Sequence, residues 1–205
     1  MITEVLRRRL ATSEEWVAKA LLRVRLRPSH VTVIPPLFAW CLILPLLLAG
    51  HLAAALIVVA LAFPLDAVDG AMARCSQQAG PWGHFCDLLA DRVSDAGLLV
   101  GVLLYQKLHL PTSTTTSLLL TAAATLWFVQ SQVTVLMSTL SSSLRLGWLQ
   151  RTERITILVV ALAATWPFSV AGLLYGAALL LGAEVCTIAY RCRQAYRYLT
   201  LSPGE

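Results

Sequence analysis

The chain alternates between long apolar stretches and short polar connections over most of its length. Six apolar segments follow one another, at residues 31–50, 52–73, 84–105, 115–138, 153–166 and 168–190. All but the fifth approach the roughly 20 residues that a helix needs to cross the hydrocarbon core of a bilayer. The pattern predicts an all-α polytopic membrane protein with six transmembrane helices.

The first 27 residues follow a different pattern, in which basic residues alternate with apolar ones at a loosely amphipathic spacing. Thr12 and Glu15 fit a capping box at the start of a short helix. We expect an interfacial amphipathic helix lying on anionic lipid, in preference to a helix that binds a partner. The predicted organisation is a juxtamembrane helix at residues 1–27, a six-helix domain at 28–190 and a basic cytoplasmic tail at 191–205.

Prolines and short connections refine this arrangement. Pro35, Pro36 and Pro45 are expected to kink the first span, since a proline nitrogen cannot donate a helical hydrogen bond. The connections at Gly50-His51 and Trp166-Pro167 are very short. Spans one and two, and spans five and six, should therefore form antiparallel hairpins.

Composition and charge place the protein in a membrane. The 205 residues are 58% hydrophobic and 13% charged, with a net charge of +5. Basic residues lie between the apolar spans, so they are better read as topology signals and lipid contacts than as a nucleic-acid surface. Placing the N-terminus inside puts every Lys and Arg except Lys107 on the cytoplasmic side, which predicts cytosolic termini and a multi-pass protein of the cell membrane. The five cysteines have no metal-ligand spacing and are expected to be packing residues.

Carboxylates interrupt the apolar pattern in the second and third spans. Asp66 and Asp69 are three residues apart and Asp87 and Asp91 four apart, so each pair lies on one face of its helix. The two spans run in opposite directions through a turn at Gly80-Pro81, which brings both pairs to one depth near the cytoplasmic surface. Four converging carboxylates suit two hard divalent ions, Mg²⁺ or Mn²⁺, and two such ions imply phosphoryl chemistry.

A purely structural interpretation pairs helix-end aspartates with arginines at the membrane boundary. That interpretation explains any single aspartate as well as a metal site does, but it explains the set poorly, because a charged carboxylate at membrane depth costs roughly 2.5–3.5 kcal/mol or more. Asp95, one turn further into the third span, is better explained as a buried hydrogen-bond partner or as a residue that supports the ligands than as a ligand itself. Gly70 would let a nucleotide approach the helix closely, and Arg74 could then bind a phosphate or the base.

Together these residues form the pattern Asp66-x-x-Asp69-Gly70-x-x-Ala73-Arg74, then Gly83-x-x-x-Asp87-x-x-x-Asp91. The pattern resembles at every fixed position the signature of the CDP-alcohol phosphatidyltransferase family. The resemblance implies that Asp66, Asp69 and Asp87 are metal ligands, and that Asp91 contacts the second metal and acts as general base. It also implies donor-lipid contacts from Gly70, Arg74 and the segment Ser29, His30, Val31 and Thr32. Family members are usually homodimers.

Among subfamilies, the sequence around Asp69, Asp91, Ser131 and Arg154 is most similar to the actinobacterial phosphatidylinositol-phosphate synthases. The resemblance implies transfer from CDP-diacylglycerol to an inositol phosphate, with Arg154 as a substrate contact. Two positions depart from that pattern: Ser138-Thr139-Leu140 replaces a Lys-x-Arg that contacts the acceptor phosphate, and Gly80, a further substrate-contact position, replaces a Ser or Thr. Arg145 and Arg151 are read equally well as acceptor contacts and as topology signals.

The leading hypothesis is an enzyme of phospholipid biosynthesis that moves a phosphatidyl group from CDP-diacylglycerol to a small polyol and releases CMP. A second hypothesis keeps the chemistry and changes the acceptor to glycerol 3-phosphate or an unphosphorylated alcohol. A third is a non-catalytic paralogue that binds CDP-lipid. The intact aspartates argue against the third, because a metal cluster without turnover carries a desolvation cost for no evident gain.

Overall fold

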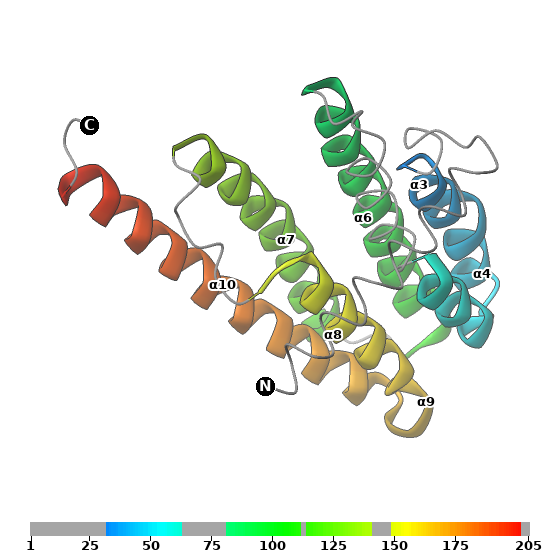
Figure 1. The fold of residues 1–205 in the computed structure, drawn as a ribbon. Helices are drawn as coiled ribbons and strands as arrows, with labels where there is room; N and C mark the ends of the chain where they lie inside the picture. The colour runs from blue at the N-terminus through cyan, green and yellow to red at the C-terminus, as the bar shows by residue number, and fades with distance from the viewer. Residues whose placement is uncertain (1–31, 63–80, 112–113, 141–148, 202–205) are drawn as a thin grey trace, which may run out of the picture. The chain divides into compact units, whose positions relative to one another are not determined.

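The computed structural model describes residues 32–62, 81–111, 114–140 and 149–201 (Figure 1). Every element of regular structure in these four ranges is helical, which confirms the predicted helical class. The chain divides into two compact units, residues 1–101 and 102–205. The expected interfacial helix at 1–27 and the second half of the expected second span lie outside the described residues.

The first span consists of three consecutive helical segments, α3 (Ile34–Phe38), the π-helix η1 (Ala39–Ile43) and α4 (Leu44–Leu48). Pro35 and Pro36 lie in the first turn of α3, where backbone N–H groups have no helical acceptor, so neither removes a hydrogen bond. Just before Pro45, the backbone N–H of Leu44 donates to the carbonyl of Ala39, five residues back. The wide π-turn thus precedes the proline whose nitrogen has no hydrogen to donate.

A tight turn joins α4 to the next helical segment, Leu52–Ala62. Gly50 lies in this turn with φ of 78°, a left-handed conformation that glycine adopts without steric cost. The short connection expected at Gly50-His51 is confirmed.

In the first unit, α6 (Pro81–His109) packs closely on the π-helix. The indole Nε1 of Trp40 donates to the backbone carbonyl of Val93 at 2.9 Å. A Cβ placed on Gly97 would lie 3.0 Å from both Ala39 Cβ and Trp40 Nε1, closer than ordinary packing allows. Glycine at position 97 therefore lets the indole reach the α6 backbone, next to the turns that carry the aspartates.

Replacing Trp40 by Phe keeps an aromatic ring and removes this hydrogen bond. We expect the variant to lose about 1 kcal/mol of stability, the usual net contribution of one hydrogen bond. Thermal unfolding in detergent micelles measures the effect. Trp82→Phe is the matched control, because Trp82 is 75% exposed and a phenylalanine keeps its stacking on Phe85. Equal melting temperatures for Trp40→Phe and wild type would contradict the assigned role of the indole N–H.

The second unit contains α7 (Thr114–Leu140), α8 (Arg151–Ala163), α9 (Thr165–Phe168) and α10 (Val170–Leu201), and α10 runs beside both α7 and α8 (Figure 1). Buried positions recur at alternating spacings of three and four on both long helices, the spacing of a coiled-coil seam. On α7 they include Leu120, Ala123, Trp127, Gln130, Ser131 and Met137. On α10 they are Leu173, Ala177, Leu180, Glu184, Thr187 and Arg191. On α10 the buried residues are apolar near the start and polar further along, whereas α7 buries the polar Gln130 and Ser131 between apolar residues.

α8 and α10 form the antiparallel hairpin expected around Trp166-Pro167. A Cβ on Gly172 would lie 2.6 Å from the Ala164 carbonyl, and one on Gly176 would lie 2.1 Å from Ala161 Cβ. Because the contact moves backward along α8 as it moves forward along α10, the two helices are antiparallel. The connection is longer than expected, since it contains the short helix α9 and Ser169 with φ of 52°.

The helix ends differ from the expected spans mainly at the C-terminus. α7 agrees closely with the span expected at 115–138, whereas α10 continues through Leu201, well beyond 190. Among the residues that the structure describes, two helices, Thr114–Leu140 and Val170–Thr200, are long and apolar enough to cross a membrane by length and composition. α8, with 13 residues, spans only about 20 Å at 1.5 Å per residue. The six-span topology and the domain bounds stay predictions.

Candidate functional site

α6 places three aspartates along one side of its first half. Asp87 and Asp91 are half-buried and one turn apart, and Asp95, a further turn along, is 1% exposed. Residues four apart on a helix are neighbours, so the carboxylates of Asp87 and Asp91 lie on one face. The burial of Asp95 is consistent with its expected role as a hydrogen-bond partner.

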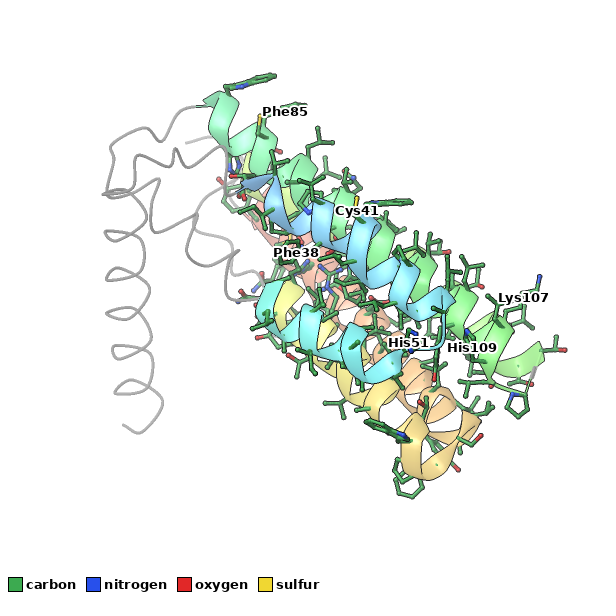
Figure 2. All side chains as sticks on the ribbon, turned by 90° about the vertical axis from the view of Figure 1, so that its right-hand side faces the viewer. Phe38, Cys41, His51, Phe85, Lys107 and His109 are labelled. Atoms are coloured by element: carbon green, nitrogen blue, oxygen red, sulfur yellow. The ribbon has the colours of Figure 1, made fainter. Side chains whose placement is uncertain are left out.

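Aromatic residues mark the start of α6. The rings of Trp82 and Phe85 stack with centroids 5.6 Å apart, and both side chains are exposed. Figure 2 shows Phe85 near the start of α6 and Lys107 and His109 near its end. At roughly 1.5 Å per residue, Asp87 and Lys107 are about 30 Å apart along the helix, close to the thickness of a bilayer's hydrocarbon core. α6 thus has the length to carry Asp87 at one membrane surface and Lys107 at the other.

Most of the other residues expected at the site fall outside the described ranges. Asp66, Asp69, Gly70, Arg74 and Gly80 lie in 63–80, and Ser29, His30 and Val31 lie in 1–31. Thr32 is described and half-buried. Within the described ranges no three acidic, histidine or cysteine side chains form a group able to hold a metal ion. The structure therefore describes two of the four expected ligands, and the convergence of all four stays a prediction.

The two described ligands fit a divalent cation by their chemistry. Asp87 and Asp91 are carboxylates, half-buried and on one helix face, and oxygen donors of this kind are preferred by Mg²⁺ and Mn²⁺. His84 and Cys86 lie on the turn that carries Asp87, so the expectation of a hard cation rests on the two carboxylates and not on an absence of softer donors.

Arg154, the acceptor contact that the resemblance favours, lies within the described ranges, at the start of α8. Glu153 accepts a hydrogen bond from the backbone N–H of Gln150 at 2.8 Å, which fixes the start of α8 and turns the next residue inward. Arg154 is 4% exposed, and its guanidinium donates to the Trp127 carbonyl at 2.9 Å and to Ser131 Oγ at 3.4 Å. It also lies 4.5 Å from the centroid of the Trp127 ring, within cation–π range. Its substrate role stays a prediction.

A second buried arginine, Arg191, lies in the second half of α10. Arg191 is 2% exposed and donates to the carbonyls of Gln130 and Leu149 and to the hydroxyl of Thr134. The Gln130 side-chain amide donates to the same Leu149 carbonyl at 2.6 Å. Gln130 and Ser131 thus join α7 to the neighbouring segments by hydrogen bonds.

The last turn of α7 carries no basic side chain. Ser138 donates to the Val135 carbonyl and Thr139 to the Leu136 carbonyl, both at 2.7 Å, and both residues are exposed. Their hydroxyl hydrogens are therefore used within the helix. Because Ser138-Thr139-Leu140 is uncharged, it cannot supply the positive charges of the Lys-x-Arg that it replaces in the subfamily pattern.

Sequence reasoning missed two buried charges in the second unit. Glu184 was not considered, and Arg191 was counted only as a topology signal, although both lie in the α7–α10 seam. The sequence does contain a sign of Glu184, because a carboxylate within an apolar span is as unusual at position 184 as at Asp87. It was overlooked because Glu184 belongs to no recognisable motif.

Comparison with known proteins agrees with this arrangement. Phosphatidylinositol phosphate synthase of Mycobacterium tuberculosis is 29% identical over 199 residues, which cover 92% of this chain and 86% of the relative. Its crystal structure with CDP-DAG bound superposes with a TM-score of 0.77 at 28% identity, covering 89% of this chain and 93% of that one. Its complex with manganese and citrate gives the same TM-score and identity, covering 89% of this chain and 88% of that one.

An archaeal relative matches over a shorter region. Archaetidylinositol phosphate synthase of Pyrococcus horikoshii is 34% identical over 90 residues, 44% of this chain, and the match spans about half of the relative, 47%. The family model described as CDP-alcohol phosphatidyltransferase matches residues 25–189, a range that contains every aspartate of the motif as well as Arg154 and Glu184. The chain belongs to the CDP-alcohol phosphatidyltransferase family of enzymes.

Proposed function

We propose that this protein transfers the phosphatidyl group of CDP-diacylglycerol to a hydroxyl of a small polyol, an inositol phosphate or a close analogue, and releases CMP. The observation that carries the proposal is the family match across residues 25–189 together with the placement of Asp87 and Asp91 on one face of α6. The mycobacterial relative is named for synthesis of phosphatidylinositol phosphate, and its solved structures contain CDP-DAG in one case and manganese in another.

The donor side of the site is assigned to residues near the start of the six-helix domain and to the turn region before α6. Gly70 would leave room for the cytidine nucleotide, Arg74 would pair with a phosphate, and Gly80 would lie beside the substrate. The segment Ser29 to Thr32 would complete the nucleotide contacts. These assignments rest on the motif, since only Thr32 lies within the described ranges.

Asp66, Asp69, Asp87 and Asp91 would hold two divalent ions, Mg²⁺ or Mn²⁺. When bound, such ions neutralise the pyrophosphate and stabilise the charge that develops on the departing CMP. Asp91 would accept the proton of the acceptor hydroxyl while the hydroxyl oxygen forms a bond to the phosphorus of the diacylglycerol phosphate. The bond from that phosphorus to the bridging oxygen breaks, and CMP leaves with the electron pair.

The acceptor side is assigned to Arg154. A guanidinium presents five N–H donors in a planar fork that matches the oxygens of a phosphate. Arg154 uses some of these donors on Trp127 and Ser131, which hold its plane in one orientation. An arginine oriented in this way loses less side-chain entropy on binding than a mobile one.

The neutral residues at the end of α7 favour a second class of acceptor, the unphosphorylated polyols. Since Ser138 and Thr139 are neutral and bond within their own helix, the chain lacks the basic pair expected for a phosphorylated acceptor at that position. An unphosphorylated polyol would need no such pair. Glycerol 3-phosphate remains the third acceptor to compare.

The acceptor assay tests the proposal directly. Purified protein incubated with CDP-diacylglycerol and Mn²⁺ should release CMP with at least one of inositol phosphate, inositol and glycerol 3-phosphate, and mass spectrometry of the lipid product identifies which. A chelator added to the same reaction should stop CMP release. Donor binding without CMP release across the whole panel would favour the non-catalytic CDP-lipid-binding paralogue instead.

The proposal also includes the membrane location, the topology and the assembly of the protein. We place the protein in the cytoplasmic membrane as a multi-pass homodimer with both termini in the cytosol. The exposed Trp82–Phe85 pair at the start of α6 supports an active-site depth near the headgroups, where aromatic side chains collect. Cysteine accessibility in sealed vesicles would test the topology, with Lys107→Cys expected to be labelled from outside and Arg197→Cys from inside.

A further inference from the structure

The first span buries every fourth residue between positions 35 and 47. Pro35, Ala39, Ile43 and Leu47 are buried, and the residues between them are exposed or half-buried. In a regular α-helix a step of four residues turns the side chain by about 40° more than a full turn, so such a face drifts by about 120° over three steps. The wider π-turn of η1, whose hydrogen bonds reach back five residues, reduces this drift. The π-helix therefore keeps the buried residues closer to one face.

This buried face lies against the middle of α6. A Cβ placed on Gly97 would lie 3.0 Å from Ala39 Cβ, and one placed on Gly101 would lie 2.9 Å from Leu47 Cδ1. Because the contact moves forward along both elements, the first span and α6 run in the same direction. Small residues at a helix contact let two helices approach closely. The height and rotation of α6 beside the first span are therefore set at these contacts.

Trp40, the next residue of the π-helix after Ala39, reaches the α6 backbone. Its indole Nε1 donates to the Val93 carbonyl at 2.9 Å, a bond between residues 53 positions apart in the chain. A carbonyl oxygen has two lone pairs, so it can accept this bond in addition to the one from its own helix. Val93 lies two residues after Asp91 and two before Asp95. The bond therefore holds the α6 turn between these two carboxylates.

We infer that Trp40 is a positioning residue, which acts through the Val93 carbonyl and holds Asp91 at the height and rotation that bind a divalent ion. The inference rests on the proposed metal site and extends it to a residue outside the motif. Mg²⁺ and Mn²⁺ sites require ligand oxygens at distances held to about 0.2 Å. A small rotation or shift of α6 moves Asp91 by more than this, so the position of α6 affects the affinity for the ion.

Manganese binding to the full-length protein in detergent tests the inference without relying on turnover. The EPR signal of free Mn²⁺ reports binding, with CDP-diacylglycerol added if the wild type binds Mn²⁺ only in its presence. Trp40→Phe keeps an aromatic ring and removes the donor. The variant should bind Mn²⁺ about fivefold more weakly, the factor that corresponds to the net contribution of one hydrogen bond.

Gly97→Ala disturbs the same hydrogen bond from the α6 side. The added Cβ would lie 3.0 Å from Trp40 Nε1, so the indole has to move away from the Val93 carbonyl. Mn²⁺ binding should weaken by a factor similar to that of Trp40→Phe. This second variant keeps the test decisive if Trp40→Phe folds poorly.

Gly101→Ala is the matched control on the same helix. Its added Cβ would crowd the same span, at 2.9 Å from Leu47 Cδ1, but ten residues beyond Asp91. We expect a lower melting temperature and an unchanged affinity for Mn²⁺. The control thus separates a specific effect on the Asp91 turn from a general loosening of the contact between α6 and the first span.

Two results would overturn the inference: wild-type affinity for Mn²⁺ in both Trp40→Phe and Gly97→Ala, or an equal loss of affinity in Gly101→Ala. Both require a wild type that binds Mn²⁺, and both leave the proposed function standing. A wild type that binds no Mn²⁺, with or without CDP-diacylglycerol, overturns the proposed metal site itself, and with it the inference.

Discussion

Replacing Asp91 by Asn should lower the rate of CMP release by about 100-fold to 10,000-fold, the range associated with loss of a general base. The change is isosteric and removes the group proposed to accept the proton of the acceptor hydroxyl. Asp91 is half-buried on α6, so an amide of the same size fits without disturbing the helix. Turnover is measured as CMP formed from CDP-diacylglycerol under saturating acceptor and Mn²⁺.

The Asp91→Asn variant should bind CDP-diacylglycerol with an affinity close to that of wild type, because the other three carboxylates are retained. Asp87→Asn is the informative comparison, because it also removes a proposed metal ligand from the same helix face but keeps the proposed base. It should raise the Mn²⁺ concentration needed for half-maximal activity. Near wild-type turnover by Asp91→Asn, with normal folding, would refute its role as general base.

Replacing Gly176 by Ala should destabilise the protein by about 1–3 kcal/mol, the usual cost of forcing an extra carbon into a well-packed contact. The added Cβ would lie 2.1 Å from Ala161 Cβ and 3.2 Å from Ala161 Cα, so α8 and α10 would have to move apart. Because α8 carries Arg154, the proposed acceptor contact, activity should fall together with the melting temperature in detergent.

Gly182→Ala is the matched control, since it adds the same carbon to the same helix and meets nothing within 4 Å. Alanine favours helix formation over glycine by up to about 1 kcal/mol, so this variant should be as stable as wild type or slightly more stable. Equal melting temperatures for Gly176→Ala and Gly182→Ala would contradict the close α8–α10 packing.

Some features of the fold could be predicted because they depend on local spacing. The apolar runs predicted α7 to within two residues at each end, and the Gly50 and Trp166-Pro167 connections predicted two chain reversals, of which the second is longer than expected because it contains α9. The prolines were interpreted less well. Pro35 and Pro36 fall in a first turn where they remove no hydrogen bond, and the sequence pattern does not distinguish a kink from the π-turn found before Pro45.

The part of the candidate site that belongs to one sequence motif could be predicted. A spacing of four residues puts Asp87 and Asp91 on one helix face whatever the rest of the protein does. The surroundings of Arg154 could not be predicted in this way. Its partners Trp127 and Ser131 lie on another helix, α7, and no periodicity of α8 specifies which side chains will face it.

The sequence by itself determined the helical class, the family, and the face of α6 that carries the aspartates, because each depends on residue types at short, fixed separations. Only the tertiary structure decided that Arg154, Glu184 and Arg191 are buried together in the seam of α7, α8 and α10. The physical reason is that burial and electrostatic pairing depend on contacts between residues far apart in the chain, which form only when the three helices pack.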